Sequence, residues 1–169
     1  RKIKYEYNDP YRIDNMEDTL SFSVSFPNYK MFYKLRQEKD TNWIIIVCDT
    51  DIILKNKCIF WYTNAANSQI NLVKYEDYTD SNSFEDLFSE KYGDRKNLTK
   101  KYPTDVQAEI LCMGNINKRF INKIIFDDVD LCEEYNKKLK EIECIYHPKG
   151  KGYYSMRDYF ISYGQRYGT

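Results

Sequence analysis

Tyr102-Pro-Thr-Asp-Val-Gln-Ala-Glu-Ile-Leu-Cys-Met-Gly114 joins a polar loop to an apolar run, with Glu109 at the entrance of that run. Because side chains alternate sides along a strand, a strand through this stretch places Gln107 and Glu109 on one face, opposite the apolar residues. An ionisable group beside buried apolar residues loses hydration energy, so it is retained when it is paired, hydrated or used in chemistry. The residues alone leave two interpretations open: a solvated glutamate on an edge strand, or a functional carboxylate.

Length and charge limit the classes of protein to which the chain can belong. Its 169 residues match one ordinary domain, which can bury a core without disulfides or metals. Lys plus Arg equal Asp plus Glu at 26 each, so no overall field draws the chain to nucleic acid, and any site for a polyanion must be local. The 17 tyrosines exceed what a core requires, and tyrosine rings suit half-buried positions and can stack on bases.

The cysteines and the chain start indicate a reduced, intracellular protein. The five cysteines include no Cys-x-x-Cys pair and lie mostly in apolar runs, and His147 is the only histidine, so we expect no metal site. No apolar run approaches the roughly 18 residues of a membrane span, and residues 1–4 (RKIK) do not lead into the apolar core of a signal peptide. We therefore expect a cytoplasmic protein that does not enter a membrane.

The remaining apolar patterns predict a mixture of strands and helices. Residues 20–26 (LSFSVSF) alternate apolar residues with serine, which is typical of a half-buried strand whose serine face could border a polar cleft. Residues 43–47 (WIIIV) favour a fully buried central strand. The long polar stretch 67–102 is expected to carry a substrate-facing loop. Further strands are predicted at 58–62, 107–113, 122–126 and, at an edge, 144–146; helices at 29–39, 127–142 and 153–163; and shorter helical segments at 52–55, 65–66, 84–88 and 116–120.

Several pieces of the chain, over roughly 20–126, resemble the DarT-type ADP-ribosyltransferases, toxins that attach ADP-ribose from NAD to nucleic acid. The order and spacing of the pieces agree, whereas the Gln-Ala-Glu match alone would be weak. The pieces are a Trp-led strand at 43–47, a helical turn at 51–54 (DIIL), a strand closing on Asn-Ala-Ala at 58–66, and a Gln-Ala-Glu strand at 107–113 followed by a loop and an Ile-rich strand at 121–126.

This resemblance implies a fold and an activity. The expected fold is α+β, with the split mixed β-sheets and flanking helices of ADP-ribosyltransferases and with NAD bound between the sheets, in a single domain over residues 1–169. The expected activity is mono-ADP-ribosyl transfer from NAD, as substrate and without a metal, to a base of single-stranded DNA. The protein would be a toxin or phage-defence effector restrained by an antitoxin protein. Transfer to RNA, or a non-catalytic nucleic-acid or protein-binding module on the same fold, are the alternatives.

The resemblance also assigns the catalytic residues. Breaking the bond between nicotinamide and ribose leaves positive charge on the ribose, and a carboxylate can stabilise that charge and hold the 2′-hydroxyl. Glu109 is the candidate for this role. Gln107 fits the Gln-x-Glu arrangement of ADP-ribosyltransferases, and its amide would orient substrate, although a polar edge-strand residue is the alternative interpretation.

The cofactor-binding residues follow from the same comparison. Phosphates of NAD call for cations or helix N-termini. DarT proteins carry an arginine in a Pro-Arg turn, and here the matching turn reads Phe-Pro-Asn-Tyr-Lys, so Asn28 and Lys30 are the nearest candidates and Arg12 is a rival. Asn64 could cap a helix whose N-terminus faces the cofactor, although capping alone would also explain it.

One departure from the family pattern concerns the start of the chain. The family opens with a His-x-Thr strand and an Asn-Leu helix that hold the nicotinamide half of NAD, and nothing before Arg12 matches them. The chain is therefore expected to lack the family's N-terminal NAD-binding segment. A truncated chain is favoured over a degenerate family member, because Glu109 and its surroundings are intact.

Overall fold

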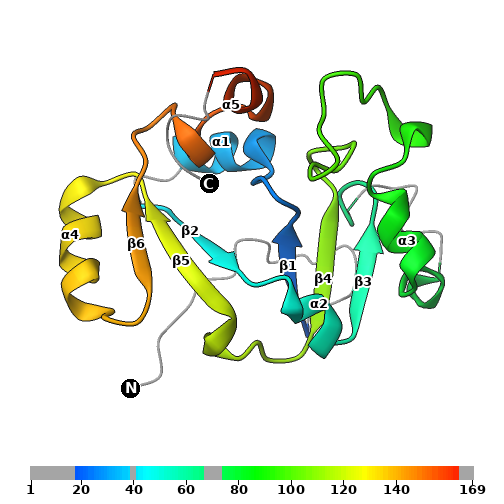
Figure 1. The fold of residues 1–169 in the computed structure, drawn as a ribbon, viewed down its shortest axis with the longest axis horizontal. Helices are drawn as coiled ribbons and strands as arrows, with labels where there is room; N and C mark the ends of the chain where they lie inside the picture. The colour runs from blue at the N-terminus through cyan, green and yellow to red at the C-terminus, as the bar shows by residue number, and fades with distance from the viewer. Residues whose placement is uncertain (1–17, 39–40, 67–73, 164–169) are drawn as a thin grey trace.

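The computed structural model describes residues 18–38, 41–66 and 74–163, and within them two three-stranded sheets lie side by side (Figure 1). The first sheet has the order β1-β4-β3, with both pairs antiparallel. The second has the order β2-β5-β6, with β2 antiparallel and β6 parallel to β5. The strands are β1 (Thr19–Ser23), β2 (Ile44–Cys48), β3 (Cys58–Trp61), β4 (Glu109–Met113), β5 (Ile121–Phe126) and β6 (Glu143–Tyr146).

Short helices flank the sheets. In Figure 1, α4 lies on the outer side of the second sheet, α3 lies beside β3, and α1 and α5 lie together at one end of the molecule. The predicted α+β fold with two split sheets and flanking helices is therefore confirmed, although only the second sheet is mixed. The helices are α1 (Tyr29–Glu38), α2 (Asp51–Lys55), α3 (Ser81–Asp86), α4 (Val129–Lys138) and α5 (Arg157–Tyr163), with 3₁₀ helices η2 (Tyr75–Tyr78), η3 (Glu90–Tyr92), η4 (Lys118–Phe120) and η5 (Gly152–Tyr154).

Strand β4 is the buried centre of the first sheet. Leu111 and Cys112 are fully buried because apolar clusters cover both faces of the strand. One cluster includes Phe60 and Leu87, and the other includes Trp61. The strand that begins with Glu109 is therefore held from both sides, which fixes the position of its first residue.

The prediction for 43–47 was wrong in one respect. Strand β2 forms there, but it lies at the edge of its sheet, and Ile44 and Ile46 are 43% and 48% exposed. The central, buried strand of that sheet is β5, whose Ile125 is fully buried. An apolar run indicates a strand with apolar sides, but its position in the sheet depends on pairing with distant residues.

Several element ends differ from the predictions for local reasons. The strand predicted at 20–26 ends at Ser23, and Ser25 has φ 59°, which no strand residue adopts. The helix predicted to reach 142 ends at Lys138 because Leu139 leaves helical geometry. Its N-terminus was predicted correctly, since the carboxylate of Asp128 accepts the Leu131 N–H at 2.9 Å.

The segment predicted as a polar loop is partly packed. Its described part carries η2, α3 and η3, and Leu87 after α3 is fully buried. Thr104 anchors the far end of the segment, because its hydroxyl donates to the Ser89 carbonyl at 2.8 Å and its N–H donates to the Leu87 carbonyl at 2.8 Å. These contacts place the chain that follows at the mouth of β4.

No helix among the described residues is long and apolar enough to cross a membrane. Within the same residues, no group of three or more potential ligands could hold a metal ion.

Candidate active site

Glu109 is the first residue of the central strand and has strand neighbours on both sides. In the register of the sheet it lies opposite Ser23 of β1 and opposite Trp61 of β3. Directly opposed residues point to the same face of a sheet, so the hydroxyl of Ser23 and the indole of Trp61 flank the carboxylate. Glu109 is half-buried, which leaves part of its side chain accessible.

Two side chains orient the Glu109 carboxylate. The Ser21 hydroxyl donates to Oε2 at 3.1 Å, and the Asn64 amide Nδ2 donates to Oε1 at 2.8 Å. The other end of the Asn64 amide is fixed as well, because its Oδ1 accepts the Ala66 N–H at 2.8 Å. The carboxylate is thus held by residues of β1 and of the turn after β3.

The turn before β4 is tied to the turn after β3. The Thr63 hydroxyl donates to Oδ2 of Asp105 at 2.7 Å, and Oδ1 of Asp105 accepts the Gln107 N–H at 2.9 Å. One carboxylate therefore holds the segment that presents Asn64 against the segment that presents Gln107. The strand predicted to include Gln107 begins at Glu109 instead, because this Asp105 turn takes the Gln107 amide away from the sheet ladder. Burial still alternates as predicted: Gln107 is half-buried, whereas Val106 and Ala108 are buried.

The N-terminus of α1 lies next to the strand partner of Glu109. The backbone N–H of Asn28 donates to the Ser23 hydroxyl at 3.1 Å, and its side-chain Oδ1 accepts the Met31 N–H at 3.3 Å. Asn28 is only 3% exposed, and its Nδ2 has no hydrogen-bond partner among the described residues. A buried donor without a partner is costly, so it marks a place where a ligand atom could be received.

The structure brings together most of the residues that the sequence indicates. Asn28 caps the helix whose first turn includes the exposed Lys30, and Asn64 contacts Glu109 directly. Arg12 lies outside the described residues. Asn64 closes a turn over 65–66, since its Oδ1 accepts the Ala66 N–H, and any helix continuing from this turn would lie outside the described residues.

Four supporting residues belong to the site, and a sequence pattern indicated two of them. The alternating serines of 20–26 were expected to border a polar cleft, and Ser21 and Ser23 lie on the Glu109 face. Thr63 and Asp105 were not identified as partners, since their contact joins residues 42 positions apart. No local sequence pattern predicts such a contact.

The fold and the sequence of this chain are similar to those of known proteins. The chain is similar in fold to the solved structure of Thermosipho africanus DarTG in complex with ADP-ribose, with a TM-score of 0.52 and 13% identity over 86% of this chain and 41% of that one. It thus spans less than half of the DarTG chain. Thermus sp. 2.9 DarT in complex with NAD+ matches with a TM-score of 0.49 and 17% identity, over 78% of this chain and 71% of that one.

A family model described as "ssDNA thymidine ADP-ribosyltransferase, DarT" matches residues 20–150, which are most of the chain. The chain belongs to the DarT family, as the resemblance in the sequence predicted. Comparison with curated protein sequences gave no match.

Proposed function

We propose that this chain transfers one ADP-ribose unit from NAD to a thymidine base of single-stranded DNA. The observation that carries the proposal is the Glu109 carboxylate, fixed by Ser21 and Asn64 at the mouth of the central strand in a chain of the DarT family. The acceptor follows from the description of the family model.

Glu109 has a defined role in this proposal. The bond between the ribose C1′ and the nicotinamide nitrogen breaks, and its electron pair leaves with nicotinamide. The ribose then carries positive charge, which an adjacent carboxylate stabilises while it accepts a hydrogen bond from the 2′-hydroxyl. A nucleophilic atom of the base bonds to C1′ and gives up its proton to the solvent. Ser21 and Asn64 keep the carboxylate from turning away during this step.

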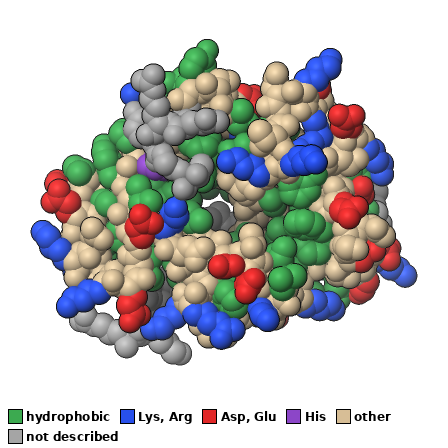
Figure 2. Space-filling model, viewed as in Figure 1, with side chains coloured by type: hydrophobic (Ala, Val, Ile, Leu, Met, Phe, Trp, Pro, Cys, Tyr) green, Lys and Arg blue, Asp and Glu red, His purple; other side chains and the backbone are tan. Residues whose placement is uncertain are grey.

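The N-terminus of α1 would receive the phosphates of NAD. Backbone N–H groups and the helix dipole favour an anion there, and the unused Asn28 Nδ2 adds a buried donor. Lys30 in the first turn would supply a positive charge. Figure 2 shows a hollow near the centre of the view, between the halves of the molecule that the two sheets form in Figure 1, which fits a ligand between the sheets.

Three further roles complete the proposal. Gln107, in the turn held by Asp105, would orient the substrate through its side-chain amide. Arg12 remains a rival for the phosphates. As the family resemblance implies, the protein would act in the cytoplasm as a toxin or phage-defence effector, with an antitoxin protein as its partner.

Substitution of Glu109 by Gln tests the proposal. Glu109→Gln keeps the shape of the side chain and removes its charge, so transfer of labelled ADP-ribose to a thymidine-containing single strand should fall on the order of 10²–10³-fold or more, as for other groups that stabilise transition-state charge. The Tm should stay near that of the unchanged protein. Glu143→Gln at the exposed start of β6 is the matched control and should keep full activity.

Two results would contradict the proposal. Equal transfer by Glu109→Gln and the unchanged chain would show that Glu109 is structural. An unchanged chain that binds single strands but neither binds NAD nor transfers ADP-ribose would be the non-catalytic binding module.

A further inference from the structure

Cys58 and Cys112 lie directly opposite each other in the β3–β4 ladder. The neighbouring pair is Lys57 and Met113, and there the Met113 N–H donates to the Lys57 carbonyl at 2.9 Å. Hydrogen-bonded and non-hydrogen-bonded pairs alternate along an antiparallel ladder, so Cys58 and Cys112 occupy a non-hydrogen-bonded pair. The Cα atoms of such a pair are about 4.5 Å apart, which is within the range that a disulfide spans.

The two thiols are already in contact. Their Sγ atoms are 2.8 Å apart, both cysteines are free, and Cys58 and Cys112 are 4% and 0% exposed. A disulfide bond is about 2.05 Å long, so closing it requires the sulfurs to approach by about 0.8 Å. No strand needs to change register for this movement.

The contact also distinguishes the two sulfurs chemically. The hydrogen bond between the two thiols lowers the pKa of Cys58, and the same bond, followed by burial, raises the pKa of Cys112. Cys58 is therefore the sulfur that more readily becomes a thiolate, the reactive form of cysteine. Cys112 retains its proton and is positioned to react second.

We propose that Cys58 and Cys112 form an oxidation site, at which a peroxide closes an intrachain disulfide between β3 and β4. The Cys58 thiolate attacks one oxygen of hydrogen peroxide, the O–O bond breaks, and the departing hydroxide is protonated to water. The Cys112 sulfur then attacks the resulting sulfenic sulfur, the S–OH bond breaks, and the Cys112 proton leaves with the hydroxide as water. Both thiols are oxidised, and the peroxide is reduced.

The position of Cys58 and Cys112 determines how an oxidant reaches them and what a disulfide between them would do. Cys58 is the first residue of β3, and strand ends open more readily than strand centres, which admits a small oxidant. The other end of the same strand pair is closed by the Asn64–Glu109 hydrogen bond. The disulfide would fasten β3 to β4 at the end away from the site, so it should stabilise the first sheet without displacing Glu109.

The chain contains its own controls. Cys132 and Cys144 lie together in the core of the second sheet, where the Cys144 thiol is directed to the Ile142 carbonyl at 3.8 Å. Cys48 is half-buried and packs against the cluster that holds the oxidisable pair. If a place in an apolar core were enough for oxidation, any of these thiols could cross-link. We expect a cross-link only between Cys58 and Cys112, whose sulfurs are in contact.

The test treats the folded chain with hydrogen peroxide, unfolds it, and counts free thiols by maleimide labelling and mass spectrometry. The reduced chain should bind five maleimides, one per cysteine, and the oxidised chain three, with the Cys58 peptide joined to the Cys112 peptide. Oxidation should raise the Tm, and dithiothreitol should reverse both changes. Cys132→Ala should still lose two of its thiols through the same cross-link, whereas Cys58→Ala and Cys112→Ala should form no cross-link.

Other results overturn the proposal. These are five free thiols after oxidation, a cross-link through Cys48, Cys132 or Cys144, or conversion of Cys58 to a sulfinic or sulfonic acid without a cross-link. Peptide mapping of the unchanged chain decides among them even if a variant fails to fold.

Discussion

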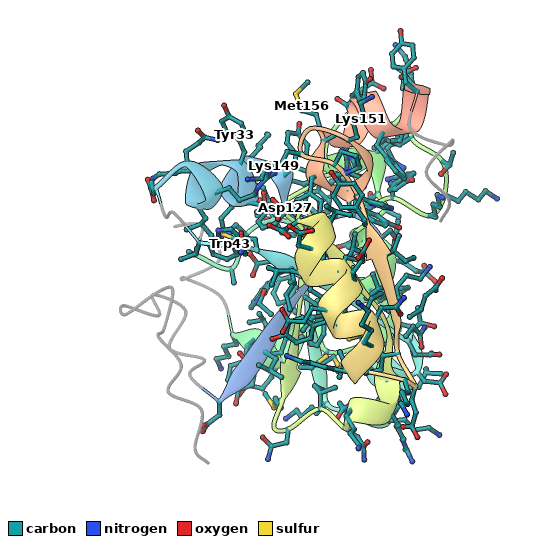
Figure 3. All side chains as sticks on the ribbon, turned by 90° about the vertical axis from the view of Figure 1, so that its left-hand side faces the viewer. Tyr33, Trp43, Asp127, Lys149, Lys151 and Met156 are labelled. Atoms are coloured by element: carbon teal, nitrogen blue, oxygen red, sulfur yellow. The ribbon has the colours of Figure 1, made fainter. Side chains whose placement is uncertain are left out.

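Arg36 and Asp127 form a mostly buried ion pair that joins helix α1 to the end of β5. The distance from Nη2 to Oδ2 is 3.4 Å, and the two side chains are 13% and 4% exposed. The guanidinium also lies over the rings of Phe32 and Tyr154, with its carbon 5.4 and 4.9 Å from the centroids. Figure 3 shows Asp127 beside Trp43 at the end of the second sheet, near α1. This contact fixes helix α1, whose capping residue, Asn28, contacts Ser23, the strand partner of Glu109.

Removing one charge of this pair should destabilise the fold strongly. Asp127→Asn leaves the Arg36 charge largely buried without its partner, which costs about 3–5 kcal/mol of unfolding free energy. Denaturant unfolding measures the loss. Adding Arg36→Met to Asp127→Asn should recover much of it, because an apolar replacement for both charges is often nearly neutral.

Glu134→Gln, in the exposed pair with Lys138, is the control and should cost less than about 0.5 kcal/mol. Equal effects of Asp127→Asn and Glu134→Gln would contradict this account.

Tyr154 should make stability fall at alkaline pH. The single proton of its hydroxyl is shared between the carbonyls of Trp43 and Ile125, each 2.9 Å from the hydroxyl oxygen, and burial is the main cause that raises its pKa. The unfolded chain loses this proton near pH 10, whereas the folded chain retains it to higher pH. The stabilisation is therefore complete below about pH 10 and is lost as the pH rises further.

Substitution of Tyr154 by Phe isolates this effect. Tyr154→Phe should lower stability at pH 8 by about 1–3 kcal/mol, because two buried carbonyls lose a donor. Its unfolding free energy should then decline less steeply between pH 10 and 11, a range estimated from the usual tyrosine pKa of about 10. The cysteines and the remaining tyrosines titrate in both proteins, so the difference between the two curves reports Tyr154. Parallel curves would assign the alkaline loss to other groups.

Elements with a strong local pattern were predictable from the sequence. The period of α1 and the Asp128 cap of α4 depend on neighbours within a few residues, and both agree with the structure. The edge position of β2 could not be predicted, because it depends on what lies beside the strand. The Asp105 turn that shortens β4 is a local contact. The sequence does not show, however, whether the Gln107 N–H bonds to the Asp105 carboxylate or to the neighbouring strand.

The site was predictable to the same extent. Glu109 stood out because a carboxylate precedes an apolar run and because that run resembles the Gln-Ala-Glu strand of the DarT family, and the serine face of 20–26 because serine alternates with apolar residues there. The contact of Asn64 with Glu109 spans 45 positions and arises only when β3 pairs with β4. The Arg36–Asp127 pair joins the two halves of the chain in the same way.

The two roles of the Asn28 side chain can be separated. Asn28→Ser keeps an N-cap acceptor for the Met31 amide but removes the buried Nδ2. If Nδ2 binds a phosphate of NAD, this variant should weaken NAD binding by about 1.5–3 kcal/mol while stability changes little. Asn28→Ala removes the cap as well and should cost about 1 kcal/mol of stability. Titration calorimetry and thermal unfolding give the two values, and unchanged NAD affinity in both variants would exclude Asn28 from the site.

Lys30 tests the charge contribution at the same helix end. Lys30→Ala should weaken NAD binding on the order of 1.5–3 kcal/mol if the ammonium contacts the pyrophosphate. Lys34→Ala is the matched control, since Lys34 lies one turn further along α1 and forms an exposed pair with Glu38. The same loss in both variants would indicate a general effect of charge, and no loss in either would remove Lys30 from the site.

Single-stranded DNA should be a better acceptor than duplex DNA. Affinity for a duplex without sequence preference comes from neutralising phosphates, and this chain has equal numbers of basic and acidic residues. Figure 2 shows the two signs interspersed over the visible face, without a broad basic patch. A single strand presents unstacked bases that need no flipping before chemistry and that tyrosine rings can contact.

Labelling of a thymidine-containing strand should therefore fall when its complement is annealed, and a strand without thymidine should remain unlabelled. RNA of matching sequence forms the third arm of the experiment. Equal labelling of single-stranded and duplex DNA, preferential labelling of RNA, or labelling of protein alone would contradict the proposed acceptor.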